Sequence, residues 1–412
     1  MKVLVVSQYF WPENFRINDL AVGLVERGHE VTVLTGMPNY PGGKFYPGYR
    51  WFKNTREEYN GVRIHRVPLV PRGNGSGVRL AINYFSFALF ASVLSPFLCR
   101  GKFDLIFVFE PSPITVGLPA LVLKKFKSIP ILFWVQDLWP ESLSATGAVR
   151  SPRILNLVKK LVRFIYQGCD KILVTSRAYF PSIQGFGIDS KKLLYFPQSV
   201  EELYKPVTVT PGTAECALMP DGFRVMFAGN IGAAQSFETI LGAAEKLGAH
   251  SDIQWVIVGD GRMREWVETE VRRRNLTGTV HLLGRHPVES MPRFFALADV
   301  LLVTLKKEPI FALTIPGKVQ SYLACGKPII AALDGEGGRL VKESRAGLTC
   351  PAEDSDALAD AVLNMYQMSQ TQRDEMGQCG TRYYTENFSR DMLMSRLEGW
   401  MLAVSTGRTT DV

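Results

Sequence analysis

The sequence predicts an α/β protein made of two successive doubly wound domains, each built around a mainly parallel sheet. Short runs of β-branched and aromatic residues alternate along the chain with stretches whose apolar residues recur at helical spacing. A proline-bearing connector over residues 195–206 interrupts this alternation. The chain length of 412 residues also suits two domains, because a domain commonly has roughly 100–200 residues.

The first domain is predicted to open with a βαβ unit. Residues 3–7 have the composition of a buried parallel strand, residues 18–27 have helical periodicity that Gly28 ends, and residues 29–35 are strand-like again. The crossover between the two strands is expected to be right-handed. Further strands are predicted over 104–109, 130–135 and 172–175, with helices over 114–126 and 154–169.

The second domain is predicted to repeat the alternation after the connector. Its strands are expected over 224–228, 254–258, 280–283, 300–305 and 329–333, and helices over 237–247, 318–325 and 358–368. Ligands of such sheets bind beyond the carboxyl ends of the strands. The loops that follow the strands are therefore where a site is expected, in a cleft that both domains face.

The charge balance indicates an anionic partner. Lysine and arginine number 47 against 39 aspartates and glutamates, which gives a net charge of +8. This surplus favours phosphates or phospholipid surfaces. Nucleic acid is not expected as a partner, because no recognition motif accompanies the charge.

The cysteines and the first residues indicate a cytoplasmic protein. Six cysteines lie far apart without C-x-x-C spacing, so neither a zinc site nor a disulfide scaffold is predicted. No metal site is expected elsewhere, because the five histidines show no ligand spacing. The opening residues MKVLVVSQYF are typical of a buried strand rather than of a signal peptide.

Residues 78–99 resemble a membrane helix. A spanning helix needs ~20 mostly apolar residues, and Arg79, Asn83 and Pro96 weaken this run. Three interpretations stay open: a spanning helix, a buried packing helix, and a helix that lies in the membrane interface. Flanking basic residues favour the third interpretation, because they would attract an anionic leaflet.

Polar and aromatic residues follow the first predicted strand. Trp11, Glu13, Asn14 and Arg16 stand where a dinucleotide-binding protein would have the glycines of G-x-G-x-x-G, so no such site is predicted. We expect these side chains to face a ligand. The alternative is an ordinary loop with a helix cap at Asn14 or Asn18.

Two further strand ends of the first domain carry acidic residues. Glu110 follows the strand at 104–109, and Gln136 and Asp137 follow the strand at 130–135. A carboxylate at such a position can accept a proton or anchor a sugar hydroxyl, although it can also cap the next helix. Asp137 is the strongest polar candidate of this domain.

Glycine-rich turns mark the strand ends of the second domain. Gly229, Asn230 and Gly232 form a G-x-x-G turn between a strand and a helix, and Gly259 and Gly261 repeat the theme at another strand end. Glycines let backbone N–H groups approach phosphate oxygens, and a helix N-terminus adds a positive dipole. Simple tight turns are the alternative interpretation.

The segment Pro316-Gly317-Lys318 opens the predicted helix at 318–325. The free N–H groups of the first turn and the Lys318 ammonium can converge on one diphosphate. Proline at a helix start also has a purely structural explanation, but that explanation leaves the lysine unaccounted for. Phosphate binding is therefore predicted here. Asp354 and Asp356 have the spacing of a metal motif, but residues 354–356 are predicted to cap the helix that follows.

Taken together, these motifs resemble a known enzyme family. Two α/β domains with AGNIG, VGDG, HLLGR and PGKVQSYLACGKPII are similar to the retaining GT-B glycosyltransferases of group 1, over nearly the whole chain. Within that family, SQYFWPE, EPSPITVGLPA, VQDLWPES and FPQSVEELY resemble bacterial enzymes that build O-antigen, capsule or other envelope polysaccharides. Within these bacterial enzymes, the motifs are similar to those of the subgroup that resembles fucosamine transferases.

The resemblance implies a division of labour between the domains. Residues 1–198 would bind the acceptor, residues 199–389 would bind the nucleotide sugar, and a last helix at about 390–405 would pack back on the first domain. The implied reaction moves a sugar, such as an N-acetylated 6-deoxyhexose, from a UDP-sugar to a polyprenyl-diphosphate-linked saccharide at the inner face of the cytoplasmic membrane. No cofactor and no metal are implied. The alternatives are an inactive nucleotide-sugar-binding scaffold subunit and a nucleotide-sugar epimerase of the same fold.

The family motifs can also be carried over residue by residue. Gly229 and Gly232 would lie by the diphosphate, Gly284 and Arg285 by the base, and residues 316–318 by the phosphates. Asn230, Gly259, Gly261 and Ser321 complete the expected donor site. The expected acceptor site consists of Trp11, Asn14, Arg16, Glu110 and Gln136.

This chain departs from the family pattern at three places. Leu313 and Ser321 occupy the positions at which many relatives carry paired glutamates, and Asn230 and Gln235 stand where many carry a basic pair. A frequent histidine is replaced near Gln136 and Asp137. The expected catalytic group is therefore Lys318 as the main phosphate cation, with Asp137 and Glu13 orienting the acceptor or donor.

Overall fold

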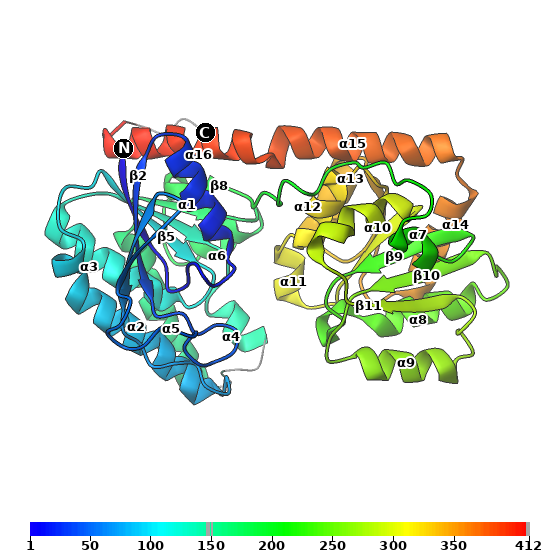
Figure 1. Ribbon diagram of the computed structural model, residues 1–412, viewed down its shortest axis with the longest axis horizontal. Helices are drawn as coiled ribbons and strands as arrows, with labels where there is room; N and C mark the ends of the chain where they lie inside the picture. The colour runs from blue at the N-terminus through cyan, green and yellow to red at the C-terminus, as the bar shows by residue number, and fades with distance from the viewer. Residues whose placement is uncertain (146–148, 150, 409–412) are drawn as a thin grey trace. The chain divides into compact units, whose positions relative to one another are not determined.

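The structure is a computed structural model that describes residues 1–145, 149 and 151–408. The chain divides into two compact units (Figure 1). Unit 1 comprises Met1–Pro197 together with Met394–Val412, and unit 2 comprises Gln198–Leu393. Both units are α/β with a mainly or wholly parallel sheet, so the predicted fold class is confirmed.

Unit 1 is built on an eight-stranded sheet in the order β3-β4-β2-β1-β5-β6-β7-β8. All neighbours are parallel except β3 and β4. Its strands are β1 (Lys2–Val6), β2 (Glu30–Gly36), β3 (Arg56–Tyr59), β4 (Val62–Val67), β5 (Leu105–Glu110), β6 (Ile131–Val135), β7 (Lys171–Val174) and β8 (Leu193–Tyr195). Its helices are α1 (Arg16–Glu26), α2 (Gly77–Leu98), α3 (Gly117–Lys127), α4 (Glu141–Ala145), α5 (Pro152–Gly168), α6 (Tyr179–Gln184) and, from Met394 onward, α16 (Arg390–Ser405).

Unit 2 is built on a six-stranded parallel sheet in the order β11-β10-β9-β12-β13-β14. Its strands are β9 (Phe223–Ala228), β10 (Ile253–Val258), β11 (Val280–Gly284), β12 (Val300–Thr304), β13 (Ile329–Ala332) and β14 (Gly347–Cys350). Its helices are α7 (Ala214–Leu218), α8 (Phe237–Lys246), α9 (Arg264–Arg273), α10 (Met291–Leu297), α11 (Pro309–Leu313), α12 (Gly317–Ala324), α13 (Glu336–Glu343), α14 (Ser355–Gln367) and α15 (Gln370–Phe388).

The central strands of both sheets are buried along almost their whole length. All residues of β5, β6, β10 and β12 are buried, which is typical of parallel strands covered by helices on both faces. The register is regular, with Val3 opposite Val31 on one side and Leu105 on the other. This burial explains why these strands were predictable as continuous apolar runs.

The strand order determines where ligands can bind in each unit. The order reverses between β1 and β5 in unit 1 and between β9 and β12 in unit 2. At such a reversal the loops after the two central strands separate, which opens a crevice at the carboxyl edge of the sheet. The loop after β1 holds Trp11, Glu13 and Asn14, and the loop after β9 holds Gly229, Asn230 and Gly232.

Helix α16 packs against unit 1. Glu398 accepts hydrogen bonds from Arg27 Nη1 and pairs with His29 Nε2, each at 2.8 Å, and the Trp400 ring meets Phe196 at 5.9 Å between centroids. The last helix therefore completes the first compact unit although it is distant from it in sequence.

Candidate active site

In unit 2, three consecutive strand ends are joined by backbone hydrogen bonds. The Gly229 N–H, after β9, donates to the carbonyl of Val258 at 2.8 Å, and the Gly259 N–H, after β10, donates to Gly284 at the end of β11, also at 2.8 Å. These bonds continue the sheet pattern into the loops. The predicted glycine-rich turns therefore lie side by side on one edge of the sheet.

Two of these glycines are required by close packing. Gly229 and Gly259 have φ values of +134° and +147°, a conformation that L side chains rarely adopt. A Cβ atom on Gly259 would lie 1.9 Å from the Gly229 carbonyl oxygen, and one on Gly229 would lie 2.7 Å from Lys318 Cε. The two turns and the start of α12 thus approach as closely as backbone allows.

The side chain of Asn230, in the first glycine turn, lies against both glycine turns. Its side-chain amide comes within 2.5 Å of where a Cβ on Gly232 would be, and within 2.7 Å of where a Cβ on Gly261 would be. The residue itself is exposed. The structure therefore brings Gly229, Asn230, Gly232, Gly259 and Gly261 together, as the sequence predicted.

Lys318 lies in the first turn of α12 and points back over β9. Its Nζ is 3.5 Å from the centroid of the buried Phe227 ring and donates a hydrogen bond to Gln235 Oε1 at 3.1 Å. Burial lowers the pKa of Lys318 to about 7. No carboxylate pairs with Lys318 among the ion pairs of the described residues.

A partly buried ammonium without a counter-ion is costly unless an anionic ligand joins it. Here Lys318 has an aromatic face, an amide oxygen and glycine backbone as neighbours, and the N-terminus of α12 adds its dipole. This arrangement can stabilise phosphate oxygens. The Phe227 ring, which supports the ammonium, is a contact that the sequence analysis did not identify, because it is one apolar residue among several in a buried strand.

The other predicted donor residues differ in their exposure. Gly317 and Arg285 are exposed, and Pro316 is half-buried. Ser321 is buried, and its hydroxyl donates to the Gly317 carbonyl at 3.2 Å within α12. A direct donor contact was predicted for Ser321, but in this structure its hydroxyl is used inside its own helix.

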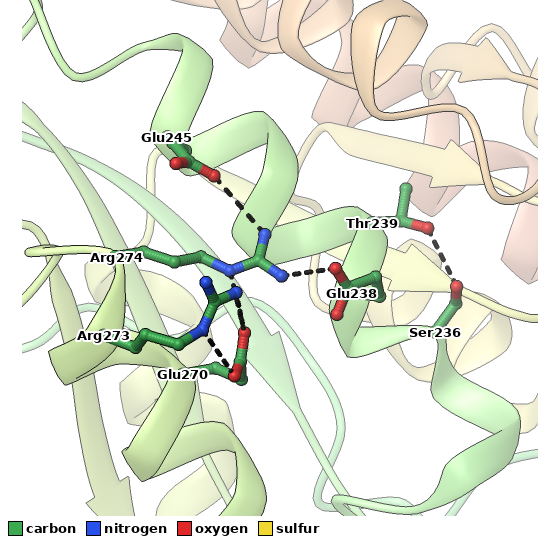
Figure 2. A network of polar contacts seen from close by, with 7 residues as sticks. All are labelled: Ser236, Glu238, Thr239, Glu245, Glu270, Arg273 and Arg274. Atoms are coloured by element: carbon green, nitrogen blue, oxygen red, sulfur yellow. Dashed lines mark hydrogen bonds and ion pairs between the residues drawn. The ribbon is translucent and has the colours of Figure 1, made fainter.

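Helix α8, which follows the first glycine turn, is anchored by a polar network (Figure 2). Arg274, at the end of α9, reaches Glu238 and Glu245 on α8 and also bonds Glu270 at 3.1 Å. The Arg274 side chain is only 8% exposed, so it ties the two helices together. The N-terminus of α8 is therefore held beside the glycine turns.

In unit 1, Glu13 lies in the interior rather than on a ligand-facing surface. Its Oε1 accepts the backbone N–H groups of Asn39 and Tyr40, each at 2.7 Å, and the residue is 1% exposed. Burial raises the pKa of Glu13 to about 7. The expectation that Glu13 touches a substrate is therefore corrected: it holds the loop after β1 to the loop after β2.

Its neighbours in the loop after β1 are partly accessible. The Trp11 ring stacks on Tyr59 at 4.9 Å, Asn14 is exposed and Arg16 is half-buried. Asn18 braces this loop by donating to the Glu13 carbonyl at 2.8 Å. Neither Asn14 nor Asn18 caps α1, whose N-cap is Phe15, so the capping alternative is wrong.

The acidic residues after β5 and β6 have different environments. Glu110 is fully buried and burial raises its pKa, so the predicted acceptor contact of Glu110 is corrected to an interior position. Asp137 is half-buried, accepts a hydrogen bond from Ser142, and also has a raised pKa through burial. Gln136 is half-buried beside it. Only Gln136 and Asp137 of this group have exposed surface.

The helix cap that the sequence predicts at residues 354–356 is confirmed. The Asp354 side chain accepts the Ala357 N–H at 2.9 Å at the start of α14. Asp356 instead pairs with Lys246. The D-x-D spacing at 354–356 therefore has a structural use.

Two protein-family models match this chain, one to each unit. The family described as "Glycosyl transferase 4-like domain" matches residues 14–198, and the family described as "Glycosyl transferases group 1" matches residues 222–368. The two matched ranges follow the division of the chain into compact units.

Bacterial glycosyltransferases are among the curated relatives of this chain. The chain is 30% identical over 257 residues to "Probable glycosyltransferase WbjE" of Pseudomonas aeruginosa, a match that covers 59% of this chain and 63% of that protein. It is 23% identical over 339 residues to "Putative colanic acid biosynthesis glycosyl transferase WcaI" of Escherichia coli, covering 79% of this chain and 82% of that protein. The chain therefore matches somewhat less than two thirds of the length of WbjE.

Solved structures share the fold over nearly the whole chain. Sucrose-phosphate synthase of Thermosynechococcus elongatus has a TM-score of 0.71 at 17% identity, covering 98% of this chain and 99% of that one. Anabaena HepE, crystallised in complex with UDP, has a TM-score of 0.69 at 12% identity, covering 98% and 100%. At these identities the likeness concerns the fold alone.

Proposed function

We propose that this chain, a glycosyltransferase of group 1 with the GT-B fold, transfers a sugar from a UDP-sugar to a lipid-linked saccharide with retention of configuration. The observation that carries the proposal is Lys318, an ammonium without a carboxylate partner among the described ion pairs, at the start of α12 beside the closely packed glycine turns after β9 and β10. UDP as the nucleotide is supported by HepE, which was crystallised with it.

In the proposed reaction, the bond between the anomeric carbon and the β-phosphate oxygen breaks while the acceptor oxygen bonds to that carbon. The acceptor proton passes to the β-phosphate, so no protein nucleophile is needed. Negative charge grows on the diphosphate as the sugar leaves. Lys318 and the N-terminus of α12, which lies beside Gly229, are preorganised to stabilise that charge, which lowers the barrier.

The two units are assigned different substrates in this proposal. Unit 2 binds the nucleotide sugar, with Arg285 near the base and the turns at Gly229 and Gly259 near the phosphates. Unit 1 binds the acceptor, with Asp137 orienting its hydroxyl and Trp11 and Arg16 contributing to the surface. Glu13 acts on this surface indirectly, by holding the loop after β2 at Asn39 and Tyr40.

The proposed acceptor is a polyprenyl-diphosphate-linked saccharide of envelope polysaccharide synthesis. WcaI, whose name refers to colanic acid biosynthesis, supports the polysaccharide class, because the match covers 79% of this chain. The proposed donor sugar is an N-acetylated 6-deoxyhexose, which rests on the resemblance of the motifs in unit 1.

We also propose that unit 1 lies on the inner leaflet of the cytoplasmic membrane. Among the described residues, the structure has one helix that is long enough and apolar enough to cross a membrane, α2 (Gly77–Leu98). Of its most apolar 18-residue window, 28% is buried. An exposed apolar stripe runs along this helix, formed by Val78, Ile82, Phe85, Leu89, Val93 and Phe97. Its opposite side, with Phe87 and Ala91, is buried and packs towards α3. One protein-facing side and one apolar side favour the interfacial position over a spanning one.

The neighbouring helices α3 and α5 also carry exposed apolar side chains. Helix α2 packs on α3 and α3 packs on α5 (Figure 1). Phe126 on α3 is 70% exposed, and Leu157 and Phe164 on α5 are 68% and 59% exposed. Helices α2, α3 and α5 contain basic residues and no aspartate or glutamate, so they suit an anionic leaflet.

The test of the proposed function is transfer by the purified full chain. A panel of UDP-sugars is incubated with and without lipid extract from a bacterium that makes such polysaccharides, and the lipid and free-sugar products are separated. Label that reaches lipid only when the extract is present supports the proposal. Release of free sugar independent of lipid indicates the epimerase alternative, and UDP binding without turnover indicates the scaffold alternative that the loss of the glutamate pair at Leu313 and Ser321 allows.

A further inference from the structure

A cage of tyrosines surrounds Arg72 at the carboxyl edge of the unit 1 sheet. Arg72 lies between β4 and α2, and its guanidinium carbon is 5.0 Å from the ring centroid of Tyr40, 5.8 Å from that of Tyr9 and 5.9 Å from that of Tyr84. Its Nη1 donates to the Tyr9 hydroxyl at 2.6 Å. The rings come from the loops after β1 and β2 and from α2.

The position of this cage is fixed by buried hydrogen bonds. The Arg72 N–H donates to Asn39 Oδ1 at 3.0 Å, and the Asn39 N–H is itself held by Glu13. On α2, the fully buried Asn83 donates to the Val70 carbonyl at 2.6 Å and accepts from Gln8 Nε2 at 2.7 Å. These bonds tie the start of α2 to the strand ends, so the guanidinium is preorganised.

The charge of Arg72 has no carboxylate partner among the described ion pairs, in contrast to Arg66, which pairs with Glu57 at 2.8 Å. Residues 68–103 contain no aspartate or glutamate. The Arg72 residue is half-buried and Tyr40 is 37% exposed, so a ligand can reach the cage. A guanidinium of this kind presents several N–H donors to phosphate oxygens.

An apolar surface starts immediately beside this cation. Tyr84 of the cage is followed along α2 by Phe85, which is 59% exposed, and Val78, about two turns earlier, is 75% exposed. The same short segment therefore presents a fixed cation and an apolar stripe. That combination fits an amphiphile whose anionic group is joined to a hydrocarbon chain.

We propose that Arg72, caged by Tyr9, Tyr40 and Tyr84, binds the diphosphate of the lipid-linked acceptor, with the first isoprenoid units lying on the α2 stripe. This inference rests on the proposed function, because it names the part of unit 1 that recognises the acceptor. The diphosphate is chosen over a phospholipid headgroup because the cage lies at the strand ends, where a sheet of this type binds its substrate.

The test compares Arg72→Gln with Arg100→Gln, which removes the same charge just beyond the other end of α2, where Arg100 is exposed. Binding of farnesyl diphosphate and of farnesol to the full chain is measured by calorimetry, and thermal melting shows that both variants fold. We expect Arg72→Gln to weaken farnesyl diphosphate about 10- to 100-fold and farnesol little, since hydrogen bonds to charged groups contribute about that much. Arg100→Gln should resemble the wild type.

Equal weakening by the two variants, or no effect of Arg72→Gln, would overturn the subsite. A second arm measures binding to phosphatidylglycerol vesicles. If Arg72→Gln weakens vesicle binding as much as farnesyl diphosphate binding, the site belongs to a phospholipid headgroup and the proposal is wrong. Tyr40→Leu should weaken farnesyl diphosphate in the same direction as Arg72→Gln, and an unchanged affinity would count against the cage.

This design separates the subsite from the proposed function. UDP binding to the Lys318 site is measured in the same variants and should be unchanged. If the wild type transfers no sugar but Arg72→Gln selectively loses farnesyl diphosphate binding, the proposed reaction is contradicted and the subsite is supported. Transfer that proceeds with equal KM for the acceptor in wild type and Arg72→Gln would support the reaction and overturn the subsite.

Discussion

Replacing Lys318 by methionine should make the ligand-free chain more stable at low and neutral pH. Burial lowers the pKa of Lys318 from its ordinary 10.5 to about 7, so the folded state disfavours the charged ammonium. A shift of this size corresponds to about 5 kcal/mol, since one pKa unit is worth ~1.4 kcal/mol. Because Lys318 keeps some exposed surface, we discount this to roughly 2–3 kcal/mol.

The sign of the pH dependence follows from proton linkage. Between pH 7 and 10.5 the unfolded chain keeps the Lys318 proton while the folded chain loses it, so wild-type stability rises with pH across this window. Below pH 7 both states are protonated and the full cost remains. The methionine variant lacks this contribution, so its stability advantage should shrink by roughly 1.5–2 kcal/mol between pH 6 and 9.5, which is most of the pH 7 to 10.5 window.

The assay is urea unfolding of the ligand-free full chain, followed by circular dichroism at several pH values. Lys306→Met, which removes an exposed lysine, is the matched control, because it changes the net charge equally. Wild-type and Lys318→Met curves that stay parallel from pH 6 to 9.5 would refute the assigned burial of the ammonium. A pH-dependent gap in the control as large as in the variant would refute it as well.

The remaining predictions concern a glycine, a buried carboxyl and the apolar stripe. Gly259→Ala should lower the free energy of unfolding by roughly 2–4 kcal/mol and abolish sugar transfer, because its Cβ would lie 1.9 Å from the Gly229 carbonyl oxygen. Unchanged thermal melting and turnover would contradict this prediction. Burial raises the pKa of Glu13 from 4.5 to about 7, so the folded chain holds this proton more tightly than the unfolded chain. The free energy of unfolding of the wild type should therefore fall by up to about 3 kcal/mol as the pH rises from about 4.5 to 7. Urea unfolding of Glu13→Gln should not show this fall. A Phe85→Ser, Leu89→Ser double variant should float less with anionic vesicles, and equal flotation would rule out the α2 stripe as a membrane surface.

Most of the fold was predictable because it depends on fully buried parallel strands. Runs such as 105–109 and 255–258 are apolar throughout, and their order along the chain leaves few topologies. The antiparallel hairpin β3–β4 was missed, since β3 consists of three charged residues and a tyrosine with none of them fully buried, and β4 contains two arginines and a histidine among its apolar residues. Strand β14 was missed for a similar reason: only Cys350 in it is buried.

The candidate site was predictable where backbone conformation demanded particular residues. Gly229 and Gly259 have positive φ values and no room for a side chain, so the sequence carries the constraint directly. Glu13 and Glu110 were misplaced, because a carboxyl after a strand has the same sequence signal whether it faces a ligand or the interior. Arg72 was missed, since its three tyrosine neighbours come from separate segments that only the folded sheet edge brings together.

The most direct measurement of the central claim is a calorimetric titration of the full chain with UDP, in two buffers of different ionisation enthalpy. If the diphosphate binds against Lys318, the ammonium must recover its proton, because the pKa rises from about 7 towards its ordinary value. We predict uptake of about one proton per UDP at pH 8.5 for the wild type, with no such uptake and much weaker binding for Lys318→Met. Equal affinity of the wild type and Lys318→Met for UDP would contradict this role of Lys318. So would UDP binding by the wild type without proton uptake at pH 8.5.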